Sequence, residues 1–442
     1  MEKDYKIAII GLGYVGLTLA LVLADKGIKI SGVEINPDVY TKLSKGIPTR
    51  NEFGIDKYLK RNLGKNFNVF LNLDTLSEKP TVYIICVPTP IKNNLPNIDH
   101  LVRATKSIGK SMSGDELIIV RSTSPVGTTR KTIIPILEIE LKNRNITSPI
   151  NIVFAPERTA EGVALKELTK LPQIIGGINE DSSLKAKKLF RKLTPTVIQV
   201  SSLESAEMIK LIDNSFRDVR FAYANEIMLL CEKIGVDAHE CITNSNTDYS
   251  RNNIPLPSPG VGGPCLSKDS YLLAGSPDTL KFLPNQQSLI LAGRLVNESI
   301  PSIIAKKIKD QIKTRLSKDK VKIFVMGFAF KGEPETDDIR NSSTVDLVKD
   351  LLNVHEVYGH DPIVSQNVLE SLNVIPTTIE DGFNNADCVI ITNNHKFYRK
   401  LDIMSLLKKS SNPCLFVDCW RLFNKKIFQD NKSIIYSGIG VD

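Results

Sequence analysis

The sequence predicts an α/β protein with two doubly wound parallel-sheet domains, joined by a long central helix and a helical domain. Three observations predict this fold class. Apolar runs alternate with segments of helical period up to about residue 200, a helical segment without strand signals follows, and apolar runs return near residue 320. We therefore expect domains at 1–202, 203–305 and 306–442.

The first domain is predicted from apolar runs that end in glycine or polar residues. "YKIAIIGLG" is typical of a buried parallel strand, and "LTLALVLADKG" follows with helical periodicity and a glycine stop. "IKISGVEIN", "TVYIICVPTP", "ELIIVRSTSPVG" and "INIVFAPE" repeat the strand pattern. Strands and helices that alternate in this way predict a parallel sheet with helices on both faces.

The middle and last parts of the chain have different characters. "ESAEMIKLIDNSFRDVRFAYANEIMLLCEKIGV" predicts one long helix, and "NQQSLILAGRLVNESIPSIIAKKIKDQI" predicts another. A long helix between two α/β halves is suited to be a dimer surface, so we expect a homodimer or a higher homo-oligomer. "VKIFVMGFAFK", "HEVYGHDP", "ADCVIITNNH" and "CLFVDCW" then predict a second, smaller parallel sheet.

Composition excludes several classes of protein. The 442 residues are 42% hydrophobic and 24% charged, as in an ordinary globular protein, and the net charge of +8 comes without any basic block that would indicate nucleic acid binding. No apolar stretch approaches the roughly 20 residues that span a membrane, so we expect a cytoplasmic protein. Seven scattered cysteines without a C-x-x-C pair argue against a disulfide framework or a zinc site, and no metal is expected.

A dinucleotide site is predicted at "GLGYVG", which places Gly11, Gly13 and Gly16 between a strand and a helix. Glycines let a pyrophosphate approach the backbone at a helix N-terminus, beside Tyr14 and Val15. Glu34, at the end of the second strand, would bind a ribose diol and repel a 2′-phosphate, which favours NAD over NADP. Thr89 in "VPTP" and Thr123 in "STSPVG" each follow an apolar strand and are candidate contacts at the same edge of the sheet; either can instead cap the next helix.

Three further segments carry residues suited to chemistry. In "PSPGVGGPCLSKD", the thiol of Cys265 stands in a bare glycine-rich stretch where a core cysteine would not be expected. Lys210 and Asn214 are four residues apart, so they share one face of the predicted long helix and can hold an oxyanion. "APERTAEG" holds two carboxylates after a strand, Glu157 and Glu161, which suit acid–base work; the alternative for each segment is an ordinary solvated surface.

Taken together, the motifs resemble the nucleotide-sugar 6-dehydrogenase family, which includes enzymes for UDP-glucose and UDP-N-acetylmannosamine. The resemblance covers nearly the whole chain and comprises, in order, "GLGYVG", "VPTP", "STSPVGTT", "APERTAEG", "KLIDNSFRDV", "PGVGGPCLSKD" and "FAFKGEPETDDIRNSS". It implies NAD as the cofactor, a UDP-sugar as the substrate and a uronic acid for surface polysaccharide biosynthesis as the product. It also implies that the third domain holds the UDP part.

The resemblance implies a role for each matching position. Cys265 corresponds to the nucleophile and Asp269 to its acidic partner, while Lys210 and Asn214 correspond to the oxyanion-stabilising pair. Glu161 matches the carboxylate that handles water or the thioester, and Glu157 and Thr123 match residues that organise the site. The remaining matches, to cofactor or substrate, are Lys268, Arg158, Arg217, Arg251, Gly262, Lys331, Arg340 and Arg421.

This chemistry explains the residue types. Oxidation of a primary alcohol to a carboxylate removes two hydrides, and a thiol can trap the intermediate aldehyde as a thiohemiacetal and then carry a thioester that water hydrolyses. We expect the glycines before Cys265 to let backbone pass close to the sugar. A helical turn that begins after Pro264 would place Asp269 near the thiol. Arg251 would reach the substrate of a neighbouring subunit.

The exact sugar stays open at this point. "NSFRDVRFAYANE" and "APER" favour a UDP-N-acetylhexosamine, UDP-ManNAc or UDP-GlcNAc, with Arg217 placed to read the acetamido group. Lys268, Asp269 and Glu161 are more typical of UDP-glucose enzymes, and Pro264 replaces the histidine usual before the cysteine in the N-acetyl branch. Two other classes of protein are alternatives. A two-electron hydroxyacid-type dehydrogenase needs no cysteine nucleophile, and a non-catalytic NAD-binding module needs none of Cys265, Lys210, Asn214 and Asp269.

Overall fold

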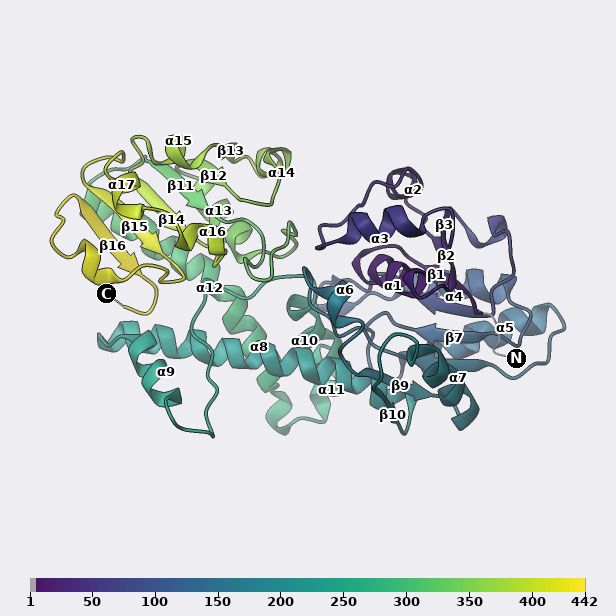
Figure 1. The fold of residues 1–442 in the computed structure, drawn as a ribbon. Helices are drawn as coiled ribbons and strands as arrows, with labels where there is room; N and C mark the ends of the chain where they lie inside the picture. The colour runs from purple at the N-terminus through teal and green to yellow at the C-terminus, as the bar shows by residue number, and fades with distance from the viewer. Residues whose placement is uncertain (1–4, 442) are drawn as a thin grey trace. The chain divides into compact units, whose positions relative to one another are not determined.

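The computed structural model describes residues 5–441 and divides into two compact units (Figure 1). The first unit contains the chain up to Asp213 together with Tyr271–Pro277, and the second contains Asn214–Ser270 and the chain from Asp278 onward. Three of the described helices, α8 (Leu203–Ile234), α10 (Leu266–Ala274) and α11 (Pro277–Lys281), contain residues of both units. The predicted α/β fold class is confirmed, with a mostly parallel sheet in each unit.

Within the described residues, the first unit holds an eight-stranded sheet in the order β10-β9-β8-β7-β4-β1-β2-β3. Its strands are β1 (Lys6–Ile10), β2 (Lys29–Val33), β3 (Phe67–Phe70), β4 (Val82–Ile85), β7 (Leu117–Val120), β8 (Asn151–Phe154), β9 (Gln173–Gly177) and β10 (Val197–Val200). All neighbours pair in parallel except β8 and β9. A separate hairpin joins β5 (Ile91–Lys92) to β6 (Leu95–Pro96). The predicted strands of this domain are all present.

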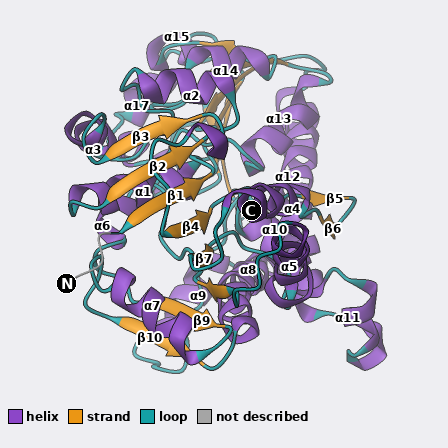
Figure 2. Cartoon of the chain, turned by 90° about the vertical axis from the view of Figure 1, so that its right-hand side faces the viewer, coloured by secondary structure: helices purple, strands orange, loops and turns teal. Residues whose placement is uncertain are grey.

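Helices cover both faces of this sheet (Figure 2). One core cluster packs the sheet against α1 (Tyr14–Asp25), α3 (Ile55–Asn62), α6 (Ala164–Glu167) and α7 (Glu180–Phe190). The other packs it against α4 (Asp99–Ser111), α5 (Ile134–Asn143) and the start of α8, and α2 (Pro37–Ser44) lies beside β3. Because both faces are buried, the central strands read as nearly continuous apolar runs.

In the described chain, the second unit holds a six-stranded parallel sheet in the order β13-β12-β11-β14-β15-β16. The strands are β11 (Lys322–Met326), β12 (Glu356–His360), β13 (Ile375–Pro376), β14 (Cys388–Ile391), β15 (Cys414–Asp418) and β16 (Ile434–Gly438). One face packs on α12 (Leu289–Gln311) and α13 (Ser343–Leu352). The other packs on α15 (Ile379–Phe383), α16 (Lys396–Arg399) and α17 (Ile403–Leu407), and α14 (Gln366–Ser371) follows β12.

The helical segment lies where the sequence predicts it. The 32-residue α8 is continuous, and α9 (Ala238–Asn246) begins after Asp237, whose carboxylate caps its first turn. α10 starts directly after Cys265, and α11 (Pro277–Lys281) follows it. Within residues 5–441, no helix has the length and apolar character needed to cross a membrane.

Candidate active site

The dinucleotide loop lies at the C-terminal end of β1, as the sequence predicts. A Cβ atom on Gly16 would lie 1.9 Å from the carbonyl oxygen of Gly11, so glycine is required there for the loop to pack on its helix. A Cβ on Gly13, in contrast, would meet nothing within 4 Å. The space above Gly13 therefore stays open at the start of α1.

This open space suits a dinucleotide. The first turn of α1 has no side-chain cap and no acidic residue, so its amides are available to an anion. Glu34 accepts hydrogen bonds from the amides of Leu12, at 3.0 Å, and Asn36, at 2.9 Å, which fixes its carboxylate beside the loop. Gly11, Gly13, Gly16 and Glu34 thus fit the phosphates and ribose of NAD.

Tyr14 directs its side chain into the protein, and Val15 packs against the core of the first unit. The Tyr14 hydroxyl hydrogen-bonds the carboxylate of Glu52 and also lies 3.4 Å from the carbonyl oxygen of Ala160. Tyr14 is the first residue of α1, so its backbone amide lies at the helix N-terminus. The loop that carries Glu161 is thereby attached to the dinucleotide loop.

The strand ends after β4 and β7 are joined by hydrogen bonds. The buried Thr89 hydroxyl donates to the carbonyl of Thr123, and the Ser122 hydroxyl donates to the carbonyl of Val87 at 2.8 Å. Thr89 does not cap a helix, which was the alternative left open by the sequence. These bonds hold both predicted segments at the same edge of the sheet.

Glu157 is a buried ion-pair partner. The guanidinium of Arg121 donates to its Oε2 at 2.6 and 3.1 Å, and the amides of Arg158 and Thr159 donate to its Oε1. Burial alone would raise the pKa of Glu157, but the Arg121 charge and these hydrogen bonds hold that pKa below its ordinary value. Glu157 therefore holds together the loop that carries Arg158 and Thr159.

The other predicted residues of the first unit lie on the same loop and on α8. Glu161 is half-buried between Ala160 and Gly162, and Arg158 forms an ion pair with Asp213 at 2.8 Å. Lys210 is buried, with 7% of its surface exposed. Three residues before it, the buried Glu207 accepts hydrogen bonds from Gly127 and Thr129, so it anchors the loop that carries Thr123.

In the second unit, Cys265 stands immediately before α10. The amides of Lys268 and Asp269 donate to its carbonyl oxygen at 3.2 and 3.0 Å, which is the first turn of the helix. The predicted helical start after Pro264 is thus present. Asp269, one turn along, is buried and accepts hydrogen bonds from Asn214 and from Lys268, the latter at 2.7 Å.

Arg217 contacts Asn214 directly. Its guanidinium donates to Asn214 Oδ1, so the Nδ2 group of the same amide is turned to Asp269. The chain Arg217, Asn214, Asp269 and Lys268 is one hydrogen-bonded set. The sequence placed Arg217 on the correct face of the helix, but its partner in the structure is Asn214.

The glycines before Cys265 pack closely on another segment of the second unit. A Cβ on Gly262 would lie 2.0 Å from the carbonyl oxygen of Asn341, and one on Gly263 would lie 2.7 Å from the Phe330 ring. Asn341 also donates to Ser267 at 2.8 Å. Glycine is therefore required here because the cysteine loop packs on the segment 328–343 of its own unit.

The remaining predicted substrate residues are spread over the second unit. Lys331 lies over the Phe330 ring at 5.5 Å, and Arg340 forms an ion pair with Asp338. The exposed Arg251 lies over the Tyr249 ring at 5.5 Å. Arg421 donates to both carboxylate oxygens of Asp237, so in this structure it serves as the partner of the α9 cap.

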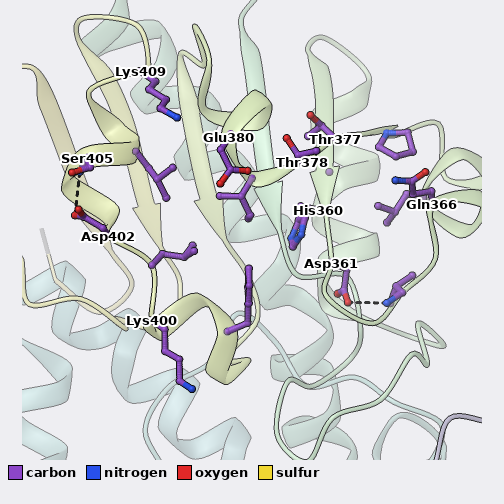
Figure 3. Close-up of a pocket in the computed structure, with 18 residues that line it drawn as sticks. His360, Asp361, Gln366, Thr377, Thr378, Glu380, Lys400, Asp402, Ser405 and Lys409 are labelled. Carbon is purple, nitrogen blue, oxygen red and sulfur yellow. Dashed lines mark hydrogen bonds between the residues drawn. The ribbon is translucent and has the colours of Figure 1, made fainter.

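A cavity of about 620 Å³ opens near the ends of β12 and β13 (Figure 3). Its lining includes His360, Glu380, Lys400 and Lys409. Asp402, which caps α17, and Ser405 of α17 lie at one end, and Gln366 of α14 lies at the other. The lining includes none of Lys331, Arg340 and Arg421. The candidate active site therefore consists of the motif residues and does not coincide with this cavity.

Several residues that shape the site were missed by sequence reasoning: Glu52, Arg121, Glu207, Asp218 and Arg294. Asp218 and Arg294 form a buried pair at 3.0 Å, and Arg294 also donates to the carbonyl of Val261 in the cysteine loop. Arg121 directly precedes the quoted "STSPVG", and Glu207 lies one turn before Lys210. That adjacency to a motif was the available signal for both.

Each unit thus presents part of an oxidoreductase: a dinucleotide loop in the first, and a thiol at a helix start with a buried carboxylate in the second. These features define the class of NAD-dependent dehydrogenases with a cysteine in the substrate half.

Three family models match along the chain: the NAD-binding domain of the UDP-glucose/GDP-mannose dehydrogenase family over residues 5–194, its central domain over 204–299 and its UDP-binding domain over 324–425. The chain belongs to the UDP-glucose/GDP-mannose dehydrogenase family. It is an NAD-dependent nucleotide-sugar dehydrogenase, as the motifs predict.

Individual relatives are similar over almost the full length. The UDP-N-acetyl-D-mannosamine dehydrogenase of Pyrococcus horikoshii is 35% identical over 439 residues, which cover 98% of this chain and 99% of that protein. The enzyme of the same name from Campylobacter jejuni is 33% identical over 409 residues, covering 90% and 97%. The solved UDP-D-ManNAc dehydrogenase structure from P. horikoshii superposes with a TM-score of 0.86 at 30% identity, covering 98% of this chain and 99% of that one.

Proposed function

We propose that this enzyme oxidises the C6 alcohol of a UDP-N-acetylhexosamine, UDP-ManNAc or UDP-GlcNAc, to the carboxylate. The observation that carries the chemistry is Cys265 at the start of α10, one turn before the buried Asp269. The N-acetylated substrate is supported by the full-length relatives, which are named for UDP-N-acetyl-D-mannosamine. UDP-glucose is the alternative, favoured by Lys268, Asp269 and Glu161.

Gly11, Gly13, Gly16 and Glu34 would hold two NAD molecules in turn, and each NAD would accept one hydride. The Cys265 sulfur adds to the C6 aldehyde that forms first, which makes a C–S bond and keeps the aldehyde from leaving. Loss of the second hydride converts this thiohemiacetal into a thioester. Water then attacks the thioester carbon, and the C–S bond breaks to release the acid and restore the thiol.

The protein groups act on charge and protons in these steps. Lys210 and Asn214, on one helix, stabilise the oxyanion character of each tetrahedral stage. Asp269, bonded to Asn214 and Lys268, holds that amide in place. Glu161 is proposed to receive the proton of the attacking water. Thr89 and Thr123 hold the strand ends beside the cofactor.

Substrate binding is assigned to charged groups of both units. Lys331, Arg340 and Arg158 are proposed to face the UDP-sugar, with Arg251 acting on the substrate of a neighbouring copy. Arg421 and Arg217 are proposed to act through Asp237 and Asn214, to which they donate. Remote binding energy from the nucleotide would fix the small reacting group.

We propose a homodimer that uses the exposed face of α8. Phe216, Tyr223 and Leu230 recur every seven residues, and their side chains are 60%, 53% and 51% exposed, with Ile234 at 72%. A seven-residue apolar repeat on one helix suits packing against a second copy. Tyr223→Asp should halve the mass in sedimentation; an unchanged mass would overturn this surface.

We propose that the chain has three domains, at residues 1–202, 203–305 and 306–442. A cytoplasmic location is proposed because the cofactor is NAD and because all seven cysteines are present without disulfides within residues 5–441.

The proposed substrate is tested by steady-state kinetics with UDP-ManNAc, UDP-GlcNAc and UDP-glucose. We expect kcat/KM for one of the N-acetylated sugars to exceed that for UDP-glucose by 10-fold or more, on the order of what one unpaired polar contact costs. A higher kcat/KM for UDP-glucose would overturn the assignment while leaving the four-electron chemistry in place.

A further inference from the structure

Glu52 joins three distant segments of the first unit on one carboxylate. It lies in the loop before α3, and only 4% of its surface is exposed. Its Oε2 accepts the Tyr14 hydroxyl and the Gly162 amide, the latter at 2.7 Å, and its Oε1 lies 3.4 Å from the Leu165 amide. The Gly162 amide also lies 2.9 Å from the Tyr14 oxygen. These contacts form what we name the Glu52 clamp: Glu52, Tyr14 and Gly162.

The buried carboxylate of Glu52 has hydrogen-bond donors around it that offset the cost of its burial. A buried carboxylate is costly unless donors surround it, and here one hydroxyl and two amides do so. Burial, followed by the hydrogen bond to Glu52, raises the pKa of Tyr14 above its ordinary value, so the hydroxyl stays a proton donor. Gly162 adopts a φ of +91°, a conformation that suits glycine and turns its amide to the clamp.

The backbone is fixed on both sides of Glu161, and the clamp holds one of these sides. Gly162 follows Glu161 and is held as described, while the amide of Ala160, which precedes it, donates to Glu167 Oε2 at 2.7 Å. The position of Glu161 therefore depends on a carboxylate 109 residues earlier in the sequence. No motif of the sequence includes Glu52.

We propose that Glu52 is a positioning residue that, together with Tyr14, fixes the Glu161 loop against the dinucleotide loop for the last step of the reaction. The proposal rests on the proposed function, in which Glu161 serves thioester hydrolysis. The earlier steps are assigned to Cys265, Lys210 and Asn214, which are not members of the clamp. Loss of the clamp should therefore slow hydrolysis and leave thioester formation in place.

The test compares the full-length variants Glu52→Gln, Tyr14→Phe and the double variant. Asp56→Asn is the matched control, because Asp56 is an exposed carboxylate four residues later on α3. Each protein is mixed with NAD and the best UDP-sugar. The readouts are the rapid formation of NADH, steady-state kcat, KM for NAD, thermal melting, and the intact mass of the quenched protein.

For Glu52→Gln we expect kcat to fall about 10- to 100-fold, the effect of misplacing a catalytic group by about 1 Å. About two NADH per site should still form rapidly, and the mass of the thioester adduct on Cys265 should accumulate. Tyr14→Phe should give the same signature with a smaller loss of about 5- to 10-fold, and the double variant should lose less than the product of the two. Asp56→Asn should match the wild-type enzyme.

An unchanged kcat in folded Glu52→Gln would overturn the proposal, as would a raised KM for NAD with kcat intact. Loss of the rapid NADH in step with a lower melting temperature would assign Glu52 to stability alone and would also overturn it. If the wild-type enzyme itself formed only one NADH per sugar, the proposed function would fail first, and the role of Glu52 with it.

Discussion

The two sheets of this enzyme begin in the same way and serve different ends. In the first unit, Ile10 of β1 pairs with Val33 of β2, and the next residue is Glu34. In the second, Met326 of β11 pairs with His360 of β12, and the next residue is Asp361. Each unit therefore places an acidic residue at the same register position beside the loop that follows its first strand.

The two acidic residues differ in what they already bind. Asp361 accepts hydrogen bonds from the amides of Phe328, Ala329, Ile363 and Val364, whereas Glu34 accepts two. A carboxylate has about four acceptor positions, so Asp361 is saturated and Glu34 has capacity for a ribose diol. The comparison teaches that the acidic residue at this register position can bind a ribose diol only where the backbone does not already use its acceptor positions.

The loops after the first strands differ as well. Residues 11–13 separate β1 from α1, but residues 327–342 separate β11 from α13. The longer segment supplies Phe330 and Asn341, which pack on the glycines before Cys265. The first unit thus keeps a short loop at the start of α1, and the second uses the same position to support the loop that carries Cys265.

The largest expected effect is the loss of acid formation when the Cys265 thiol of the second unit is removed. Cys265→Ser should lower the rate of acid formation by at least about a thousandfold, because a hydroxyl without a strong base is a poor trap for the aldehyde. Any NADH should stop near one equivalent per site, as read by absorbance against the product acid. Full turnover by this variant would move the nucleophile elsewhere.

The next effect concerns the buried ion pairs, Arg121–Glu157 in the first unit and Arg294–Asp218 in the second. Removal of one partner leaves a buried charge, so Arg121→Met and Arg294→Met should each cost about 3–5 kcal/mol of unfolding free energy in denaturant titrations. A loss of unfolding free energy below about 1 kcal/mol would mean that these charges are exposed to water, which would contradict the prediction.

The same pairs should respond to acid with opposite sign. The pKa of Glu157 is lowered, so its contribution is present above pH 4.5 and is lost as the pH falls below that value. Burial, more than Arg294, sets the pKa of Asp218, which is raised above 3.8, so protonation relieves a cost there. Glu157→Gln should therefore flatten the acid limb of stability against pH, and Asp218→Asn should steepen it.

A smaller effect tests the two acidic residues directly. Glu34→Ala should narrow the preference for NAD over NADP by about 10- to 50-fold, since the diol loses an acceptor and the 2′-phosphate loses a repelling charge. Asp361→Asn should leave that preference unchanged and lower stability by about 1–3 kcal/mol. A changed cofactor preference in Asp361→Asn would contradict the comparison.

The smallest effect is at the α9 cap. Hydrogen bonds from Arg421 and backbone amides outweigh burial and lower the pKa of Asp237 to about 2, so its contribution should fade as the pH drops from about 4 towards 2. Asp237→Asn should cost at most about 1 kcal/mol at pH 7, because the pair is half-buried. Thermal melts of the wild type and of Asp237→Asn across pH test this. A stability difference between the two that grows as the pH falls would contradict the prediction.

The sequence predicted the features that depend on neighbours along the chain. The strand ends, the Gly11–Gly16 loop, Glu34 and the helix start after Cys265 follow from local pattern and spacing. It did not predict the Glu52 clamp, the Arg121–Glu157 pair or the packing of Gly262 on Asn341, because each joins residues tens of positions apart. The antiparallel pairing of β9 was also missed, since its apolar run is the same in either direction.

The central claim is a four-electron oxidation through one cysteine. It is tested most directly by counting NADH per mole of UDP-N-acetylhexosamine consumed by the wild-type enzyme, with the product identified by mass. The account predicts two NADH and a uronic acid, with no free aldehyde trapped by an added hydroxylamine. One NADH per sugar, with the aldehyde captured in solution, would contradict it.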